Sequence, residues 1–204
     1  MMCKETQDME TFDQKHLKKL VKKFLVEENC LKTYDHCISV GDYAYELGKN
    51  YLDEPDKARI AGYLHDISAI YPDDQRIAVA KKMGIDLYKE EIELPMIIHQ
   101  KISKKIAFNE FNVTDPVILS AIECHTTLKE DYSDLDLVVF IADKIKWDQQ
   151  GEPPYIEGLM TALDHSLEAA AYYYIDYLLN HGIQVLHPWL NEAHVKLKKQ
   201  LESV

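Results

Sequence analysis

A His-Asp doublet, His65-Asp66, is the part of the sequence best suited to chemistry. It follows the largely apolar segment 58–64, where an unpaired carboxylate would be costly to bury. An imidazole and a carboxylate side by side offer a metal ion two ligands from one turn of backbone. Further candidate ligands lie on either side of the doublet: His36, His99, His125 and Asp143. Together, the six residues predict a metal site with nitrogen and oxygen ligands.

Each candidate ligand also has a simpler interpretation. A histidine on an apolar helix face is often a hydrogen-bonded core residue, and His16 and His194 share such faces without belonging to the set. Asp143 could be a buried carboxylate that a lysine or backbone amides satisfy. The prediction of a site therefore depends on the six residues converging. Other templates are absent from the sequence: Glu-x-x-His, HExxH, the Walker-type phosphate loop and GxSxG.

The elements that must position these residues are helices. Helical periodicity dominates, and no segment shows the alternation typical of a strand. Roughly ten helices are expected, among them one that begins at Glu54-Pro55 and others near 12–28, 34–51, 72–84, 95–111, 114–127, 133–147, 155–180 and 189–201. The sequence thus predicts an all-α bundle in a single domain, residues 9–204, preceded by a frayed segment, residues 1–8.

The candidate ligands fall on the apolar faces of these helices. His36 shares a face with Val40 and Leu47, and Asp143 follows the apolar run 137–142. The other three histidines align with aliphatic residues three or four positions away. Five different helices would therefore direct polar side chains at one core, as in bundles that hold a metal in their interior.

Charge and composition exclude several classes of partner. The 204 residues include 35 acidic and 23 basic side chains, for a formal net charge of −12. Nucleic acid is disfavoured because its binding needs a basic stripe. A phosphate site in such a chain must supply its own positive charge, from metal ions and a few lysines. With neither a signal-peptide pattern nor a bilayer-length apolar stretch, we expect a cytoplasmic protein without a membrane partner.

The order His, His-Asp, His, His and Asp on successive helices resembles the HD-domain metal-dependent phosphohydrolases. The chain is most similar to their YqeK-like branch, the symmetrical bis(5′-nucleosyl)-tetraphosphatases. The matching segments are Tyr34-Asp35-His36, Leu64-His65-Asp66, Ile98-His99, Cys124-His125-Thr126-Thr127 and Phe140-Ile141-Ala142-Asp143, with a weaker match from Gly182 to His187-Pro188. The resemblance implies an all-α HD-domain bundle.

It also implies roles for the candidate ligands. The principal metal, iron or manganese, would have four ligands: His36, His65, Asp66 and Asp143. Asp66 would also be the catalytic residue. The remaining pair, His99 and His125, would either hold a second metal bridged through Asp66 or contact substrate phosphate. One or two ions per chain are therefore expected. The implied reaction is hydrolysis of diadenosine tetraphosphate to two ADP.

The segments expected to contact substrate depart from this branch. Its members usually have a lysine three residues after the HD aspartate, where this chain has Ala69, and glycine and proline where it has the segment 128–131. The arginine expected behind Ala-Asp is also missing. Thr126 would bind phosphate, and either Lys144 or Lys146 would replace the missing arginine. Lysine would act there as a point charge, without the two parallel hydrogen bonds that arginine can make. The alternative for both lysines is a solvated helix face.

Two other classes of function remain open. One is an HD enzyme for another nucleotide, such as a nucleoside monophosphate. The other is a helical module that has kept the fold without catalysis, against which the six retained ligands argue. In the enzymatic cases the partner is a small-molecule nucleotide, and a homodimer remains open.

Overall fold

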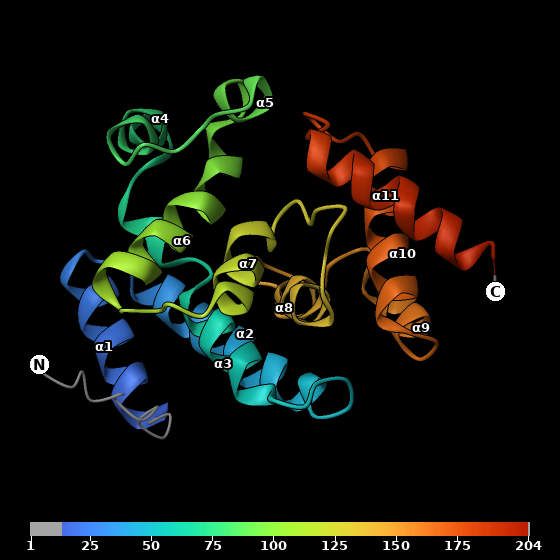
Figure 1. The fold of residues 1–204 in the computed structure, drawn as a ribbon, viewed down its shortest axis with the longest axis horizontal. Helices are drawn as coiled ribbons and strands as arrows, with labels where there is room; N and C mark the ends of the chain where they lie inside the picture. The colour runs from blue at the N-terminus through green and yellow to red at the C-terminus, as the bar shows by residue number, and fades with distance from the viewer. Residues whose placement is uncertain (1–13, 204) are drawn as a thin grey trace, which may run out of the picture.

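The computed structural model describes residues 14–203, so the expected frayed segment 1–8 lies outside the described residues. This part of the chain contains helices and no strand (Figure 1). The elements are α1 (Gln14–Glu27), α2 (Leu31–Gly48), α3 (Pro55–Leu64), the 3₁₀ helix η1 (Ile67–Ile70), α4 (Asp73–Lys82), α5 (Lys89–Glu93), the 3₁₀ helix η2 (Pro95–Ile98), α6 (His99–Glu110), α7 (Pro116–Cys124), α8 (Asp134–Ile145), α9 (Ile156–Leu163), α10 (Leu167–Asn180) and α11 (Pro188–Leu201).

Two helix starts follow directly from the residues that precede them. The Asp115 side chain accepts a hydrogen bond from the Val117 amide at 2.9 Å, and Pro116 occupies the first helical position of α7. Ser133 and Asp136 form a reciprocal capping box at the start of α8. Both starts agree with the sequence prediction because capping is a local interaction.

The single helix predicted over 155–180 is wrong. Two helices, α9 and α10, occupy this range, and Ser166 separates them. The Ser166 hydroxyl accepts a hydrogen bond from the Ala169 amide at 3.0 Å, so this serine begins a new helix rather than continuing the old one. The short helices η1 and α5 were also not predicted, and the first turn of the helix predicted from Pro95 is the 3₁₀ helix η2.

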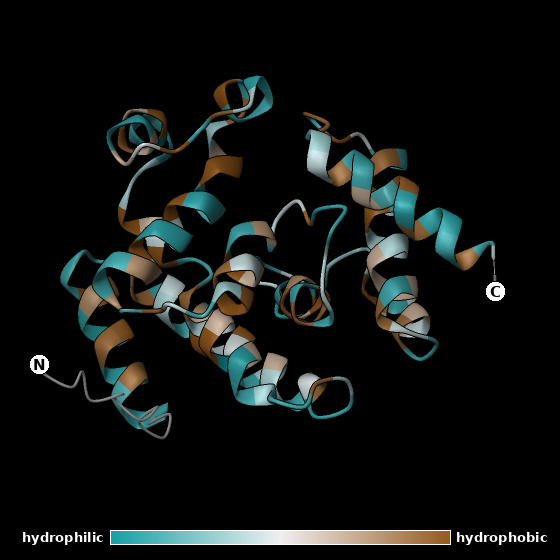
Figure 2. Cartoon of the chain, in the orientation of Figure 1, coloured by the Kyte–Doolittle hydropathy of each residue, from teal (hydrophilic) through white to brown (hydrophobic). Residues whose placement is uncertain are grey.

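Helix α8 forms the centre of the fold. Its residues 135–142 are all buried, and it packs against α2, α3, α7 and α10. Figure 1 shows it nearly end-on in the middle of the molecule, and Figure 2 shows the mixed polar and apolar faces of the surrounding helices. A helix that is apolar on all sides must be surrounded by protein, which explains the apolar run before Asp143.

Helices α2 and α3 cross at two glycines. A Cβ atom on Gly62 would lie 2.5 Å from the Gly41 Cα and 2.8 Å from its amide nitrogen, so the two backbones are in direct contact. A Cβ on Gly41 would overlap the ring of Tyr63. This close approach brings His36 of α2 next to His65, which follows α3.

In the part of the chain that is described, no helix has the length and apolarity needed to cross a membrane.

Candidate active site

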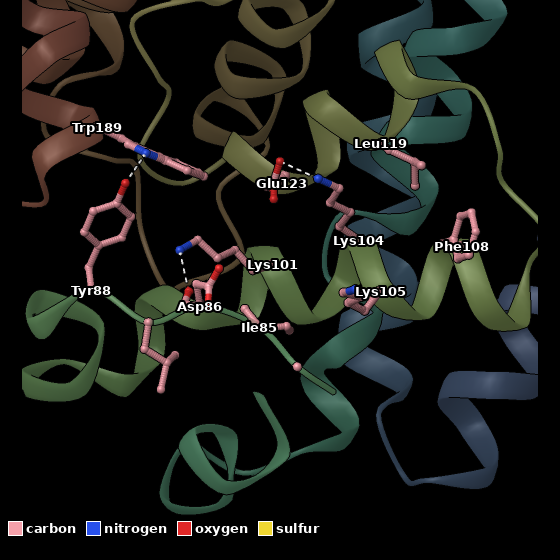
Figure 3. Close-up of a pocket in the computed structure, with 12 residues that line it drawn as sticks. Ile85, Asp86, Tyr88, Lys101, Lys104, Lys105, Phe108, Leu119, Glu123 and Trp189 are labelled. Atoms are coloured by element: carbon pink, nitrogen blue, oxygen red, sulfur yellow. Dashed lines mark hydrogen bonds and ion pairs between the residues drawn. The ribbon is translucent and has the colours of Figure 1, made fainter. Parts of the chain in front are cut away.

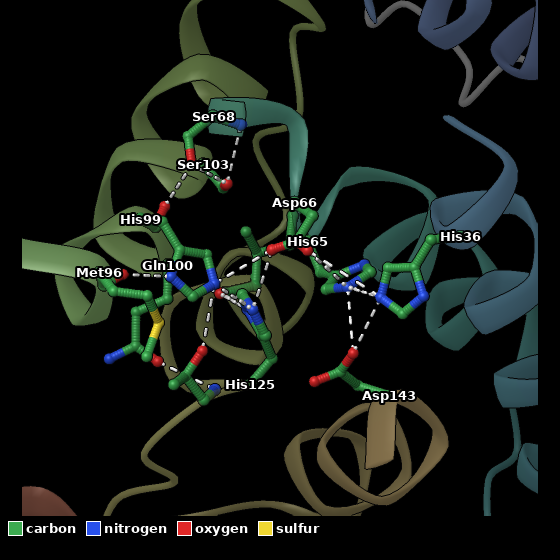
Figure 4. Close-up of polar contacts among 12 residues, drawn as sticks. His36, His65, Asp66, Ser68, Met96, His99, Gln100, Ser103, His125 and Asp143 are labelled. Carbon is green, nitrogen blue, oxygen red and sulfur yellow. Dashed lines mark hydrogen bonds and ion pairs between the residues drawn. The ribbon is translucent and has the colours of Figure 1, made fainter. Parts of the chain in front are cut away.

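The structure brings the six predicted ligands together (Figure 4). They come from five segments: His36 in α2, His65 and Asp66 directly after α3, His99 at the start of α6, His125 directly after α7, and Asp143 within α8. The prediction that all of them lie within helices is wrong for His65 and His125, which cap the C-terminal ends of their helices. This end position lets each of the two rings fold back onto its own last turn.

The first group of ligand atoms gathers around one oxygen of Asp143. Asp143 Oδ1 lies 3.1 Å from His36 Nε2 and 3.4 Å from His65 Nε2. These two nitrogens are 3.2 Å apart. Asp66 Oδ2 approaches the same nitrogens at 3.9 Å and 3.6 Å, respectively. His36, His65 and Asp143 therefore form a compact set of donors able to hold a metal ion.

A second group lies on the other side of Asp66. Asp66 Oδ1 is 3.0 Å from His99 Nε2 and 3.4 Å from His125 Nε2, and these two nitrogens are 2.8 Å apart. His65, Asp66 and His125 form a further set with metal-binding geometry. Asp66 thus turns one oxygen to each pair of histidines, as Figure 4 shows.

Backbone carbonyls fix the orientation of three rings. The Nδ1 atoms of His65, His99 and His125 lie 2.7, 2.6 and 2.9 Å from the carbonyl oxygens three residues earlier. A carbonyl oxygen only accepts, so each Nδ1 carries a proton, and Nε2 points inward, where it offers a lone pair whenever the ring is neutral. This is the arrangement in which metal-ligating histidines are held by their other ring nitrogen.

The inward lone pairs make a cation necessary. In the neutral state, His99 Nε2 and His125 Nε2 would face each other at 2.8 Å as two acceptors. Asp66 Oδ1, which is buried beside them, accepts no hydrogen bond. A shared proton or a metal ion satisfies all three atoms, because each offers a lone pair. The donor set therefore fits a metal ion.

The charge states of the two carboxylates agree with this fit. Burial opposes the ionised form of Asp66, but His65 and His99 hold the pKa of its carboxyl well below the usual value. Burial also opposes the ionised form of Asp143, yet Lys144 and His36 keep its pKa well below the usual value. Burial lowers the pKa of His125 to about 4, so this ring is neutral at physiological pH and its lone pair is free to bind.

The predicted substrate residues have different positions. Lys144 is buried and donates to Asp143 Oδ2 at 2.6 Å and to the His125 carbonyl at 3.2 Å, so its ammonium group is already engaged. Lys146 lies over the ring of Tyr43, 4.6 Å from its centroid, and does not line the pocket at the site. Thr126 lines that pocket, with its hydroxyl 3.2 Å from His99 Nε2.

The pocket at this site has a volume of about 460 Å³ and a mixed polar and apolar lining. Five of the six candidate ligands line it: His36, Asp66, His99, His125 and Asp143. Apolar and aromatic side chains that the sequence analysis did not assign also line it, including Leu94, Met96, Ile97, Trp147, Tyr155, Tyr174, Leu178, Ile183, Val185 and Leu190. No motif marks these residues, because they reach the pocket from segments that lie far apart in the sequence.

Fold and site together define the class of protein. The family model of the HD domain matches residues 33–148, more than half of the chain, so the chain belongs to the HD domain family. An uncharacterized protein in the pepC 5′ region of Lactococcus lactis subsp. cremoris is 54% identical over 145 residues, which are 71% of this chain and 74% of that protein.

Two further relatives carry functional descriptions. A symmetrical bis(5′-nucleosyl)-tetraphosphatase of Staphylococcus aureus is 31% identical over 133 residues, which are 63% of this chain and 64% of that protein, slightly under two thirds of its length. The crystal structure described as a predicted HD superfamily hydrolase involved in NAD metabolism from Clostridium acetobutylicum is similar with a TM-score of 0.81. Its sequence is 27% identical, and the match covers 94% of this chain and 100% of that chain.

The chain is therefore an HD-domain hydrolase. The predictions of an all-α HD fold, of the HD family with its YqeK-like relatives, and of an enzyme are confirmed. The structure also contains histidine and aspartate groups that could hold a metal ion. The domain limits, residues 9–204, stay a prediction.

Proposed function

We propose that this hydrolase is metal-dependent and cleaves diadenosine tetraphosphate symmetrically into two ADP. The observation that carries the proposal is the convergence of four histidines on Asp66, with Asp143 beside two of them, in a pocket that apolar and aromatic side chains also line. Such a mixed lining suits a substrate that combines anionic phosphate with a flat, weakly polar base. The tetraphosphatase names of relatives in Staphylococcus aureus and Bacillus subtilis support this choice.

The proposed ligands of the principal ion, iron or manganese, are His36, His65, Asp66 and Asp143. His99 and His125 would hold a second ion together with Asp66 or contact substrate phosphate. A metal bound here would supply a nucleophile at neutral pH by lowering the pKa of water, and would polarise the phosphoryl group. Imidazole and carboxylate ligands with open positions suit such metals.

The side chains of the protein have separate tasks in this reaction. The backbone carbonyls that bind Nδ1 hold three imidazoles with Nε2 toward the centre. Lys144 binds Oδ2 of Asp143 and so leaves Oδ1 directed at His36 and His65. The Thr126 hydroxyl can donate to a phosphate oxygen. Water adds to a central phosphorus atom, the bridging P–O bond breaks, and the leaving ADP accepts a proton.

A second candidate is an HD hydrolase for a nucleotide with fewer phosphates. Two observations favour it. Lys144 donates to Asp143, which leaves its ammonium group less free to bind phosphate. The chain also has Ala69 where the tetraphosphatase branch usually has a lysine. Fewer free cations in the pocket stabilise fewer phosphate groups.

A product analysis separates the two candidates. Metal-loaded protein is incubated with diadenosine tetraphosphate, and ADP is resolved from AMP and ATP over time. We expect ADP alone, because a symmetrical split at the central anhydride gives two identical products. The matched control is the Asp143→Asn variant loaded in the same way, in which ADP formation should be lost. An untouched tetraphosphate with hydrolysis of AMP would reject the substrate and favour the second candidate.

Metal removal should lower both activity and thermal stability. The purified protein is expected to carry at least one transition metal per chain, since several imidazole and carboxylate donors lie within reach of one ion. A ligand present at 100 times its dissociation constant stabilises the folded state by about 2.7 kcal/mol. For a chain of this size, we expect chelation to lower Tm by about 5 to 10 °C. Elemental analysis before and after chelation, with calorimetry, checks this; a metal-free protein whose Tm is unchanged by iron or manganese contradicts it.

A further inference from the structure

A buried charged cluster outside the six candidate ligands connects the two walls of the pocket. Glu91 of α5 is fully buried and forms an ion pair with Lys101 of α6, at 2.8 Å between Oε1 and Nζ. His187, which directly precedes α11, is only 1% exposed, and its Nε2 lies 3.5 Å from the same Glu91 oxygen. The weak sequence match around His187-Pro188 thus ends at a residue that lines the pocket.

The two partners belong to opposite walls. Glu91 lies just before the segment 94–97, which lines the pocket and supplies the Met96 carbonyl that holds His99 Nδ1. His187 lies within the segment 183–190, which supplies the other wall together with α10. Figure 1 shows the start of α11 facing α5, and the contact of His187 with Glu91 joins the two. The contact therefore joins two parts of the chain that both line the pocket.

Aromatic side chains flank this contact on its outer side. Trp189 Nε1 donates to the Tyr88 hydroxyl at 3.1 Å, and the Tyr88 ring lies 4.9 Å from the ring of His187. Lys101 Nζ lies 4.6 Å from the Tyr88 ring centroid and 4.9 Å from that of Trp189. Figure 3 shows Tyr88, Lys101 and Trp189 at the edge of a second cavity of about 660 Å³. These residues shield the buried charges from solvent.

The contact between Glu91 and His187 is incomplete. The Trp189 amide donates to His187 Nδ1 at 3.2 Å, so the ring proton is on Nε2 and faces Glu91 Oε1. His187 Nε2 is buried and makes no hydrogen bond in the structure, and Glu91 Oε1, 3.5 Å away, is engaged in the ion pair with Lys101. A buried donor without an acceptor favours any small movement that brings it to one. A slight approach of α11 to α5 is such a movement.

We propose that Glu91 and His187 form a latch that closes the pocket over bound substrate. Formation of the hydrogen bond between His187 Nε2 and Glu91 Oε1 draws the segments 94–97 and 183–190 together. The two residues are positioning residues, since neither is among the metal ligands, and Lys101 keeps Glu91 charged and in place. The identity of the substrate in this latch rests on the proposed function.

The variant His187→Asn tests the latch. Asparagine keeps an acceptor for the Trp189 amide, as a good N-cap residue, but is too short to reach Glu91. We expect KM for diadenosine tetraphosphate to rise about tenfold, the change for one lost hydrogen bond to a charged group, with kcat within about twofold. Glu91→Gln keeps an acceptor oxygen but removes its charge, so it should raise KM by a smaller factor, and the double variant should add little to His187→Asn. His194→Asn, also on α11 but paired with Asp176, is the control and should leave KM unchanged.

Amide hydrogen exchange supplies a second measurement that does not need turnover. ADP should slow the exchange of residues 88–94 in the unmodified protein, but much less in His187→Asn. Equal protection in both proteins, or an unchanged KM in both single variants, overturns the latch. A lower Tm with unchanged KM also overturns it, because this is the result of a merely structural contact. The proposed function fails in a different way: the unmodified protein then forms no ADP from the tetraphosphate.

Discussion

Asp66→Asn should reduce turnover by more than the roughly 100-fold that follows loss of a residue supporting a metal ligand. Asp66 directs one oxygen to each pair of histidines, with Oδ2 near His36 and His65 and Oδ1 near His99 and His125. Asparagine has nearly the same shape but no negative charge and only one oxygen. It therefore cannot offer a charged oxygen to both pairs of histidines. The metal content should fall together with activity.

Steady-state kinetics and elemental analysis of the same preparation check this result. The control is His194→Gln, which changes a histidine 3.2 Å from Asp176 and outside the pocket, and should leave both quantities nearly unchanged. Retention of turnover and metal by Asp66→Asn would mean that the proposed ligand set is wrong. Equal losses in Asp66→Asn and His194→Gln would indicate a general effect on folding instead.

Gly62→Ala is expected to have the largest effect on stability. The added Cβ would meet backbone atoms of Gly41 at 2.5 and 2.8 Å, and backbone atoms cannot rotate away. Helices α2 and α3 must separate, at a cost of about 3 kcal/mol, the upper end for overpacked cores. This corresponds to a drop in Tm of roughly 6 to 12 °C for a chain of this length. Because the same movement separates His36 from His65, the metal content should also decrease.

Gly48→Ala, at the end of α2, is the matched control. Its Cβ would meet the flexible end of Leu52 at 3.1 Å and Pro55 at 3.5 Å, so the neighbours can adjust. Alanine is also the better helix former by about 1 kcal/mol, so the variant should be neutral or slightly stabilised. The measurement is the Tm and the metal content of both variants. A Gly62→Ala protein as stable as Gly48→Ala would show that the close crossing of α2 and α3 is unimportant.

The sequence by itself determined the helical class, the HD family and the identity of the six converging residues. Helical periodicity and caps such as Asp115 and Ser133 are local properties, so they can be recognised without a structure. The most specific signal was the run His125-Thr126-Thr127 followed by Ala142-Asp143, whereas the His-Asp doublet indicated only the superfamily. The sequence pattern also gave one wrong prediction, a single helix over 155–180, because Ser166 begins a new helix there.

Only the tertiary structure decided how these residues are arranged and what surrounds them. It placed Asp66 between two pairs of histidines, engaged Lys144 with Asp143, left Lys146 outside the pocket and brought Glu91 within 3.5 Å of His187. Each of these relations depends on the packing of helices, and on side-chain directions within a few ångströms. Periodicity gives the face of a helix, whereas a distance between remote residues is fixed only when the helices meet, as at the glycine contact of α2 with α3.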